Sequence, residues 1–218
     1  AGDATEAVFN GEEGQRVFEF LNTMNEAGTF GNFGTNWDDI RAAFQSGKVA
    51  MYMDSSAGVR GIIDNAPFEV GAAYIPYADE VDRKGVVIGG ASLWMSKGIA
   101  EIEQKAAWEF MKYLTTPEVQ AKWHLDTGYF AINPSAYEAD IVKEAWEKMP
   151  QLKVTVEQLQ STEPSIATQG ALISVFPESR QQIVTALENL YQGMDPKEAL
   201  DAAAEGTNRA IEIANRTK

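Results

Sequence analysis

Apolar residues recur at helical spacing through most of the chain, whereas only three short runs have the composition of strands. The first helical pattern covers residues 12–27, with Phe18 and Leu21 on its apolar stripe and Gly28 after its end. Further helices are expected after the capping residue Asn36, around Ile62, before Leu114, from Pro117, around Trp146, over Ile183–Tyr191 and from Pro196.

The three strand-like runs are residues 49–53, 69–75 and 86–96. The first is short and apolar, as expected of a buried strand, and the last contains the pair Gly89-Gly90. No internal repeat or low-complexity segment interrupts these patterns. Many helices combined with few strands predict an α/β fold.

Composition removes several kinds of chemistry from consideration. The formal net charge of −14 disfavours nucleic-acid binding, because an acidic surface repels the phosphate backbone. The chain has no cysteine and a single histidine, His124, so neither thiolate nor multi-histidine metal sites are expected. Phosphate-loop and G-x-S-x-G motifs are also missing. We therefore predict no catalytic residue, metal or cofactor, and a packing or surface role for His124 rather than a catalytic one.

Two small-residue turns are candidates for ligand contact. Asp54-Ser55-Ser56-Ala57-Gly58 follows the first strand-like run, and such a turn presents hydroxyl and backbone N–H groups. The segment Gly89-Gly90-Ala91-Ser92 would let a ligand approach the backbone closely. The alternatives are an ordinary serine-rich turn and a β-bulge, respectively.

Two larger polar side chains complete the candidate set. Tyr129 comes directly after the helix end at Thr127-Gly128. Arg180 lies near the start of the Ile183–Tyr191 helix, where its planar guanidinium could bind an anion. The alternative for Arg180 is a surface salt bridge, for example to Glu178.

Four segments in order resemble family 1 of the bacterial extracellular solute-binding proteins: FQSGKVAMYMDSS, IGGASLWMSKG, AAWEFMKYLTTPEVQAKWHLDTGYFAIN and FPESRQQIVTALENLYQGMDPKEALDAAAEGTNRAI. Within that family the likeness is greatest to the glycerol-3-phosphate-binding subgroup, which shares the Ser-Ser pair, GGASLW, the T-G-Y turn and an arginine before the long helix. The resemblance implies ligand contacts from Ser55 or Ser56, from backbone amides at Gly89, Gly90 and Ala91, from Tyr129, and from Arg180 on a phosphate.

The same resemblance implies an α/β type II periplasmic-binding-protein fold that is incomplete, because it covers the C-terminal half of a two-lobed protein. By the family pattern, residues 1–64 and 115–218 belong to the second lobe, and residues 67–112 cross to the first lobe. We therefore expect a longer protein, and expect Val87, Ile88, Leu93 and Trp94 to be uncovered in this chain. Ala131 departs from the family, which usually has proline there, and the departure predicts a looser loop around Tyr129.

The implied function is that of the substrate-binding component of an ABC importer. It would capture a small polar ligand such as glycerol-3-phosphate or a glycerophosphodiester by hinge closure, without chemistry, and deliver it to the permease subunits. The protein would be periplasmic or extracellular, meeting the membrane only through the permease or a lipid anchor.

Three alternatives stay open at the level of sequence. The first is a sugar- or oligosaccharide-binding protein of the same family, although SSAGVR lacks the tryptophans that stack on sugars in the maltose-type members. The others are a hydrolase using His124 or a carboxylate pair, and a structural surface domain.

Overall fold

The computed structural model describes residues 4–216, and these form nine α-helices and two 3-10 helices. They divide into two compact units. One unit contains the described residues up to Thr35 and those from Ala171 onward, and the other runs from Asn36 to Gly170.

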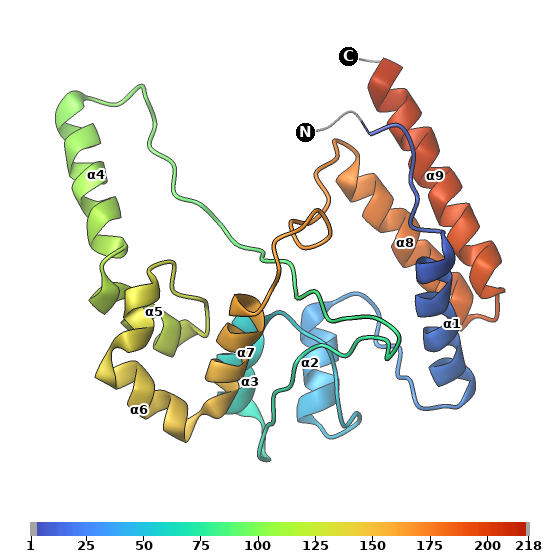
Figure 1. Ribbon diagram of the computed structural model, residues 1–218, viewed down its shortest axis with the longest axis horizontal. Coiled ribbons are helices and arrows are strands. Elements are labelled where there is room, and N and C mark those ends of the chain that lie inside the picture. The colour runs from blue at the N-terminus through green and yellow to red at the C-terminus, as the bar shows by residue number, and fades with distance from the viewer. Residues whose placement is uncertain (1–3, 217–218) are drawn as a thin grey trace. The chain divides into compact units, whose positions relative to one another are not determined.

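The first unit is a packed group of three helices: α1 (Glu12–Glu26), α8 (Phe176–Tyr191) and α9 (Pro196–Arg216) (Figure 1). Phe18, Leu190 and Leu200 lie at its centre and are almost wholly buried. Burying each such side chain contributes about 1.5–3 kcal/mol. The apolar residues at helical spacing on these three helices therefore account for their association. Leu200, Ala204 and Ile211 face inward on α9, as predicted.

The second unit is also helical. Its elements are α2 (Trp37–Gln45), η1 (Ser56–Gly58), α3 (Val59–Asn65), α4 (Glu101–Leu114), α5 (Pro117–Thr127), η2 (Pro134–Glu138), α6 (Asp140–Lys148) and α7 (Pro150–Gln160).

Asn36 caps α2 as predicted, because its Oδ1 accepts a hydrogen bond from the Asp38 backbone N–H at 2.8 Å. Ala121, Ala136 and Val142 form a buried core where α5, η2 and α6 meet.

The helix α7 was not predicted from the sequence. Pro150 occupies its first turn, and Leu152 and Val156 are buried one turn apart. The helix packs beside α3 (Figure 1). A proline followed by apolar residues at spacings of four and three (Leu152, Val156, Leu159) is the signal that identifies it.

The three predicted strands do not form: no strand occurs among residues 4–216. Run 49–53 is not buried either, since Met51 and Met53 are 84% and 70% exposed. A strand exists only when its backbone pairs with a neighbouring strand, and these runs have no such partner in the described part of the chain. They follow irregular, open paths instead (Figure 1).

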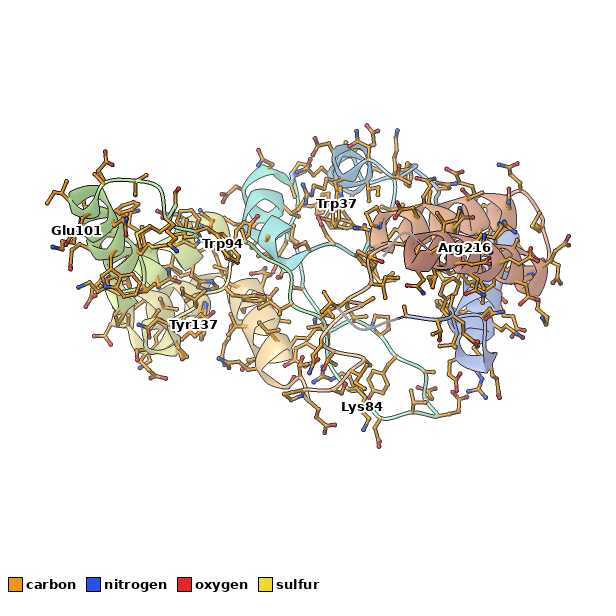
Figure 2. All side chains as sticks on the ribbon, turned by 90° about the horizontal axis from the view of Figure 1, so that it is seen from above. Trp37, Lys84, Trp94, Glu101, Tyr137 and Arg216 are labelled. Carbon is orange, nitrogen blue, oxygen red and sulfur yellow. The ribbon has the colours of Figure 1, made fainter. Side chains whose placement is uncertain are left out.

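Hydrogen bonds from the α7 region hold the long open run that follows Pro67. Gln158 Oε1 accepts from the Ile75 N–H at 2.6 Å, and Thr162 Oγ1 accepts from the Val86 N–H at 3.0 Å. The Glu163 N–H donates to the Lys84 carbonyl at 3.0 Å, and Lys84 is labelled on this loop in Figure 2. Gly85 has a φ of +117°, and a Cβ there would lie 2.6 Å from Thr162 Cα. The two segments therefore cross closely at a position that requires glycine.

Beyond this crossing the run is open to solvent. Val87, Ile88 and Leu93 are 55–63% exposed and Trp94, labelled in Figure 2, is 89% exposed, as the expected absence of a covering lobe predicted. The helix α4 likewise has no buried residue, and its Trp108 and Phe110 are 54% and 59% exposed. None of the described helices combines the length and the hydrophobicity needed to cross a bilayer.

Candidate functional site

A hollow of about 790 Å³ opens on the second unit and contains two of the predicted ligand residues, Ser55 and Tyr129. Its wall is built from α2, η1, α3 and the end of α5. The lining residues are Trp37, Asp38, Arg41, Gln45, Ser55, Ala57, Gly58, Arg60, Gly61, Ile62, Asp64, Asn65, Asp126, Thr127 and Tyr129.

Ser55 is positioned by the carboxylate of Asp54. Asp54 Oδ1 accepts the Ser55 N–H at 2.6 Å, while Arg41 donates through Nε to Oδ2 at 2.8 Å and through Nη2 to Oδ1 at 3.2 Å. This bidentate pair fixes the turn to α2. Tyr52 OH also donates to Asp54 Oδ2 at 3.2 Å, and its pKa is raised to about 12, by burial first and by the Asp54 charge second.

The end of the DSSAG turn is crowded. A Cβ at Gly58 would lie 2.9 Å from Asp54 Oδ2 and 3.2 Å from Arg41 Nη2. A larger residue would have to displace this ion pair, whereas the backbone φ of −78° at Gly58 is one that any residue adopts. Gly58, the last residue of the turn, therefore packs closely against the Arg41–Asp54 ion pair that also positions Ser55.

Tyr129 is positioned by the predicted helix end and by His124. Gly128 ends α5 in the left-handed conformation at φ +79°, where a Cβ would meet the Arg60 backbone N at 3.3 Å. His124 Nδ1 lies 2.7 Å from the Tyr129 carbonyl oxygen, and His124 Nε2 accepts the indole N–H of Trp146 at 3.1 Å. These partners assign the proton to Nδ1 in a neutral ring. His124 is wholly buried and has the packing role that we expected.

Burial also lowers the pKa of His124, and the hydrogen bond to Tyr129 opposes that shift only in part. Tyr137, labelled in Figure 2, stacks on Trp146 with ring centroids 5.5 Å apart. It stands edge-on to His124. The imidazole is therefore enclosed by two aromatic rings behind the Tyr129 turn.

The loop after Tyr129 is held by two further side chains, the buried Gln120 and the partly buried Tyr137. Gln120 accepts the Ile132 N–H at 2.8 Å, and Tyr137 OH accepts the Ala131 N–H at 2.8 Å. A proline at residue 131 would have no N–H to donate. The departure from the family pattern therefore brings a hydrogen bond that the usual proline could not make.

The other predicted residues are not among those that line this hollow. Ser56 lies in η1 beside it without lining it, and Gly89, Gly90 and Ala91 are exposed on the open run. Arg180 belongs to the other unit, in the second turn of α8, with its guanidinium carbon 5.8 Å from the centre of the Phe176 ring. No ion pair to Glu178 joins it among the described residues. Its proposed role in ligand binding remains a prediction.

Sequence reasoning missed the two arginines of the hollow. Each lies close to an aspartate, Arg41 beside Asp38 at 3.7 Å and Arg60 beside Asp64 at 2.8 Å. The helical spacings Asp38–Arg41 and Arg60–Asp64 were the available signal. Within residues 4–216 no group of three or more His, Asp or Glu side chains is arranged to hold a metal.

Comparison with known sequences gives a consistent set of relatives. Residues 1–152 match the family described as bacterial extracellular solute-binding protein. The sn-glycerol-3-phosphate-binding periplasmic protein UgpB of Pectobacterium atrosepticum is 34% identical over 216 residues, 96% of this chain and 48% of that protein. UgpB of Yersinia enterocolitica is 34% identical over 206 residues, 92% of this chain and 47% of that protein. The chain thus spans about half the length of the curated relatives it matches.

Solved structures show the same fold. UgpB from Mycobacterium tuberculosis in complex with glycerophosphocholine aligns over 95% of this chain and 50% of its own, with a TM-score of 0.75 and 21% identity. MalE from Bdellovibrio bacteriovorus bound to maltotriose aligns over 97% of this chain and 54% of its own, with a TM-score of 0.71 and 20% identity. The predicted periplasmic-binding-protein fold, represented by about half of its length, is confirmed.

Proposed function

We propose that this chain, which belongs to the family of bacterial extracellular solute-binding proteins, is part of the substrate-binding component of an ABC importer. The ligand we propose is a small polar molecule such as glycerol-3-phosphate or a glycerophosphodiester. The observation that carries the proposal is the hollow in which Ser55 and Tyr129 meet, within a chain 34% identical to a glycerol-3-phosphate-binding protein.

The hollow suits capture better than chemistry. It offers a serine hydroxyl, a phenol and the guanidinium group of Arg60, which are donors for ligand oxygen atoms. The one histidine is occupied on both ring nitrogens by Tyr129 and Trp146. The relatives are substrate-binding proteins, and we propose that this chain likewise releases its ligand unchanged to permease subunits. Family membership places the protein in the periplasm or outside the cell.

A carbohydrate ligand is the second candidate. Trp37 lines the hollow and is 53% exposed, and a tryptophan face is a common platform for sugar rings. Arg41 already lies over that ring, 5.5 Å from its centre, which leaves less of it for a sugar. This contact favours the small polar ligand over the oligosaccharide.

Isothermal titration of the full-length protein with glycerol-3-phosphate, glycerophosphocholine and maltose tests the proposal. We expect saturable binding of a phosphate ligand, recovered unchanged by mass spectrometry, and weaker binding after Ser55→Ala. Ser135→Ala, an exposed serine outside the hollow, is the matched control and should bind as the wild type does. Preference for maltose would reject the ligand, and turnover of any bound compound would reject the binding function.

A further inference from the structure

We propose that Arg60 binds an oxyanion of the ligand and is the main cationic contact supplied by the hollow. The inference deepens the proposed function and rests on it. Three observations carry it: the uncommitted donors of Arg60, its position beside the Tyr129 turn, and the full commitment of the other arginine.

The two arginines of the hollow differ in what they have left to donate. Arg41 is bound to both oxygens of Asp54, lies 3.7 Å from Asp38 and covers the ring of Trp37. Removing it from these partners would dismantle the turn that carries Ser55. Arg41 is therefore a structural cation and is poorly placed to exchange partners for a ligand.

Arg60 is held more loosely. Its Nε donates to Asp64 at 2.8 Å, and its Nη1 approaches the Met149 sulfur at 3.2 Å, which is a weak acceptor. Its Nη2 has no hydrogen-bond partner in the described part of the chain. The side chain is 30% exposed and is one of those that line the hollow, so it is partly shielded from water. A guanidinium with free N–H groups in such a place matches a phosphate or carboxylate oxygen.

The Tyr129 turn fixes the backbone of Arg60. A Cβ at Gly128 would lie 3.2 Å from Arg60 Cβ and 3.3 Å from its backbone N, so α5 ends directly against the first turn of α3. Tyr129, the next residue, lines the same hollow as Arg60 and Ser55. Arg60, Tyr129 and Ser55 thus line one hollow. The buried contact at Gly128 positions the first two, and the Asp54 turn positions Ser55.

Nearby carboxylates set the selectivity of this contact. Asp64 shares Arg60 and is 46% exposed, and it opposes an incoming anion by its charge. Asp126 also lines the hollow, and Lys122 pairs with it. Neutralising Asp64 should therefore improve anion binding if Arg60 is the contact, and should weaken binding if the hollow instead accepts a cation.

Titration of Arg60→Gln in the full-length protein with glycerol-3-phosphate and with glycerol tests the inference. A hydrogen bond to a charged group contributes about 1.5 kcal/mol or more, so we expect an affinity loss of roughly 10-fold for glycerol-3-phosphate and little change for glycerol. Arg60→Lys should recover part of the loss. Arg209→Gln is the matched control, since Arg209 also pairs with a carboxylate four residues away, on the exposed face of α9, and its loss should change nothing.

Asp64→Asn separates binding from folding. We expect it to raise glycerol-3-phosphate affinity several-fold in the wild type, with an unfolding midpoint near that of the wild type. The gain should be smaller in the Arg60→Gln background, because there the substitution removes the repulsion by the carboxylate but has no Nε of Arg60 to release for the ligand. Tight phosphate binding by the wild type that survives Arg60→Gln would overturn this inference alone. A wild type that binds neither phosphate compound would overturn the proposed ligand and the inference together.

Discussion

The burial of His124 behind the Tyr129 turn makes a strong prediction about stability. His124→Ala removes a ring that is wholly buried, leaves the Trp146 indole N–H without its acceptor at 3.1 Å, and frees the Tyr129 carbonyl. An unsatisfied buried donor costs about 1–3 kcal/mol, and the cavity adds to it. Tyr129 is half-exposed, so water can satisfy its carbonyl and we add little for it. We expect a loss of about 3–4 kcal/mol.

Urea unfolding followed by tryptophan fluorescence measures this loss. The midpoint should fall with an unchanged slope, because the same surface is exposed on unfolding. Lys122→Ala on the exposed side of the same helix should change the free energy of unfolding by less than about 0.5 kcal/mol. Equal small effects from the two substitutions would refute the reasoning, because His124 would then contribute no buried hydrogen bonds.

The same residue fixes the sign of a pH effect. Burial lowers the pKa of His124 below its ordinary value of 6.5 in the folded protein. Between the two values the unfolded chain binds the extra proton, so the free energy of unfolding rises with pH. The stability that the neutral, buried His124 contributes is fully present above about pH 6.5 and is lost as pH falls through the lowered pKa. Because the chain has one histidine, His124→Asn should reduce the pH dependence of the unfolding free energy just below pH 6.5. If the slope of the unfolding free energy against pH is the same in the variant, the lowered pKa of His124 is contradicted.

Three further predictions concern the ligand contacts and their supports. Asp54→Asn should lower the free energy of unfolding by about 1–3 kcal/mol in urea titrations and weaken ligand binding in calorimetry, because the bidentate pair that holds Ser55 loses its charge. Gly128→Ala should destabilise by about 1–2 kcal/mol through its positive φ, whereas Gly61→Ala, in open space on α3, should be neutral or stabilising; equal effects on the unfolding midpoint would contradict this. Arg180→Ala should weaken glycerol-3-phosphate binding by roughly 10- to 150-fold, with Arg180→Lys recovering part; unchanged affinity in calorimetry would remove Arg180 from the site.

Local chemistry made the helices predictable. Asn36 caps α2 and Gly128 ends α5 through their own side-chain and backbone preferences, which do not depend on distant partners. The strands were wrong for the opposite reason. Val86–Ser96 has a suitable composition, but a strand depends on a neighbour that the local sequence does not contain.

The site was predictable only in part. Ser55 and Tyr129 were singled out because Ser55 lies in a small-residue turn and Tyr129 follows the helix end at Gly128. The fold brings both to one hollow. Arg41 and Arg60, which line the same hollow, were missed because the contacts that place them there are made across elements, with Asp54 and with the Gly128 turn. Burial of His124 likewise could not be read from its neighbours in the chain.

The hydrogen bonds between the open run and the α7 region also bear on the order of folding. Ile75 and Gln158 are 83 residues apart in the chain, and Val86 and Thr162 are 76 apart. Closing loops of this length is slow compared with forming a helical hairpin such as α8–α9, whose helices are separated by four residues, 192–195. We expect amide protection in a pulse-labelling experiment to appear first in α8 and α9 and last at Val86. The crossing at Gly85 would then be the last long-range contact to form, and the segment around Val86 would stay unprotected while α8 and α9 are already folded.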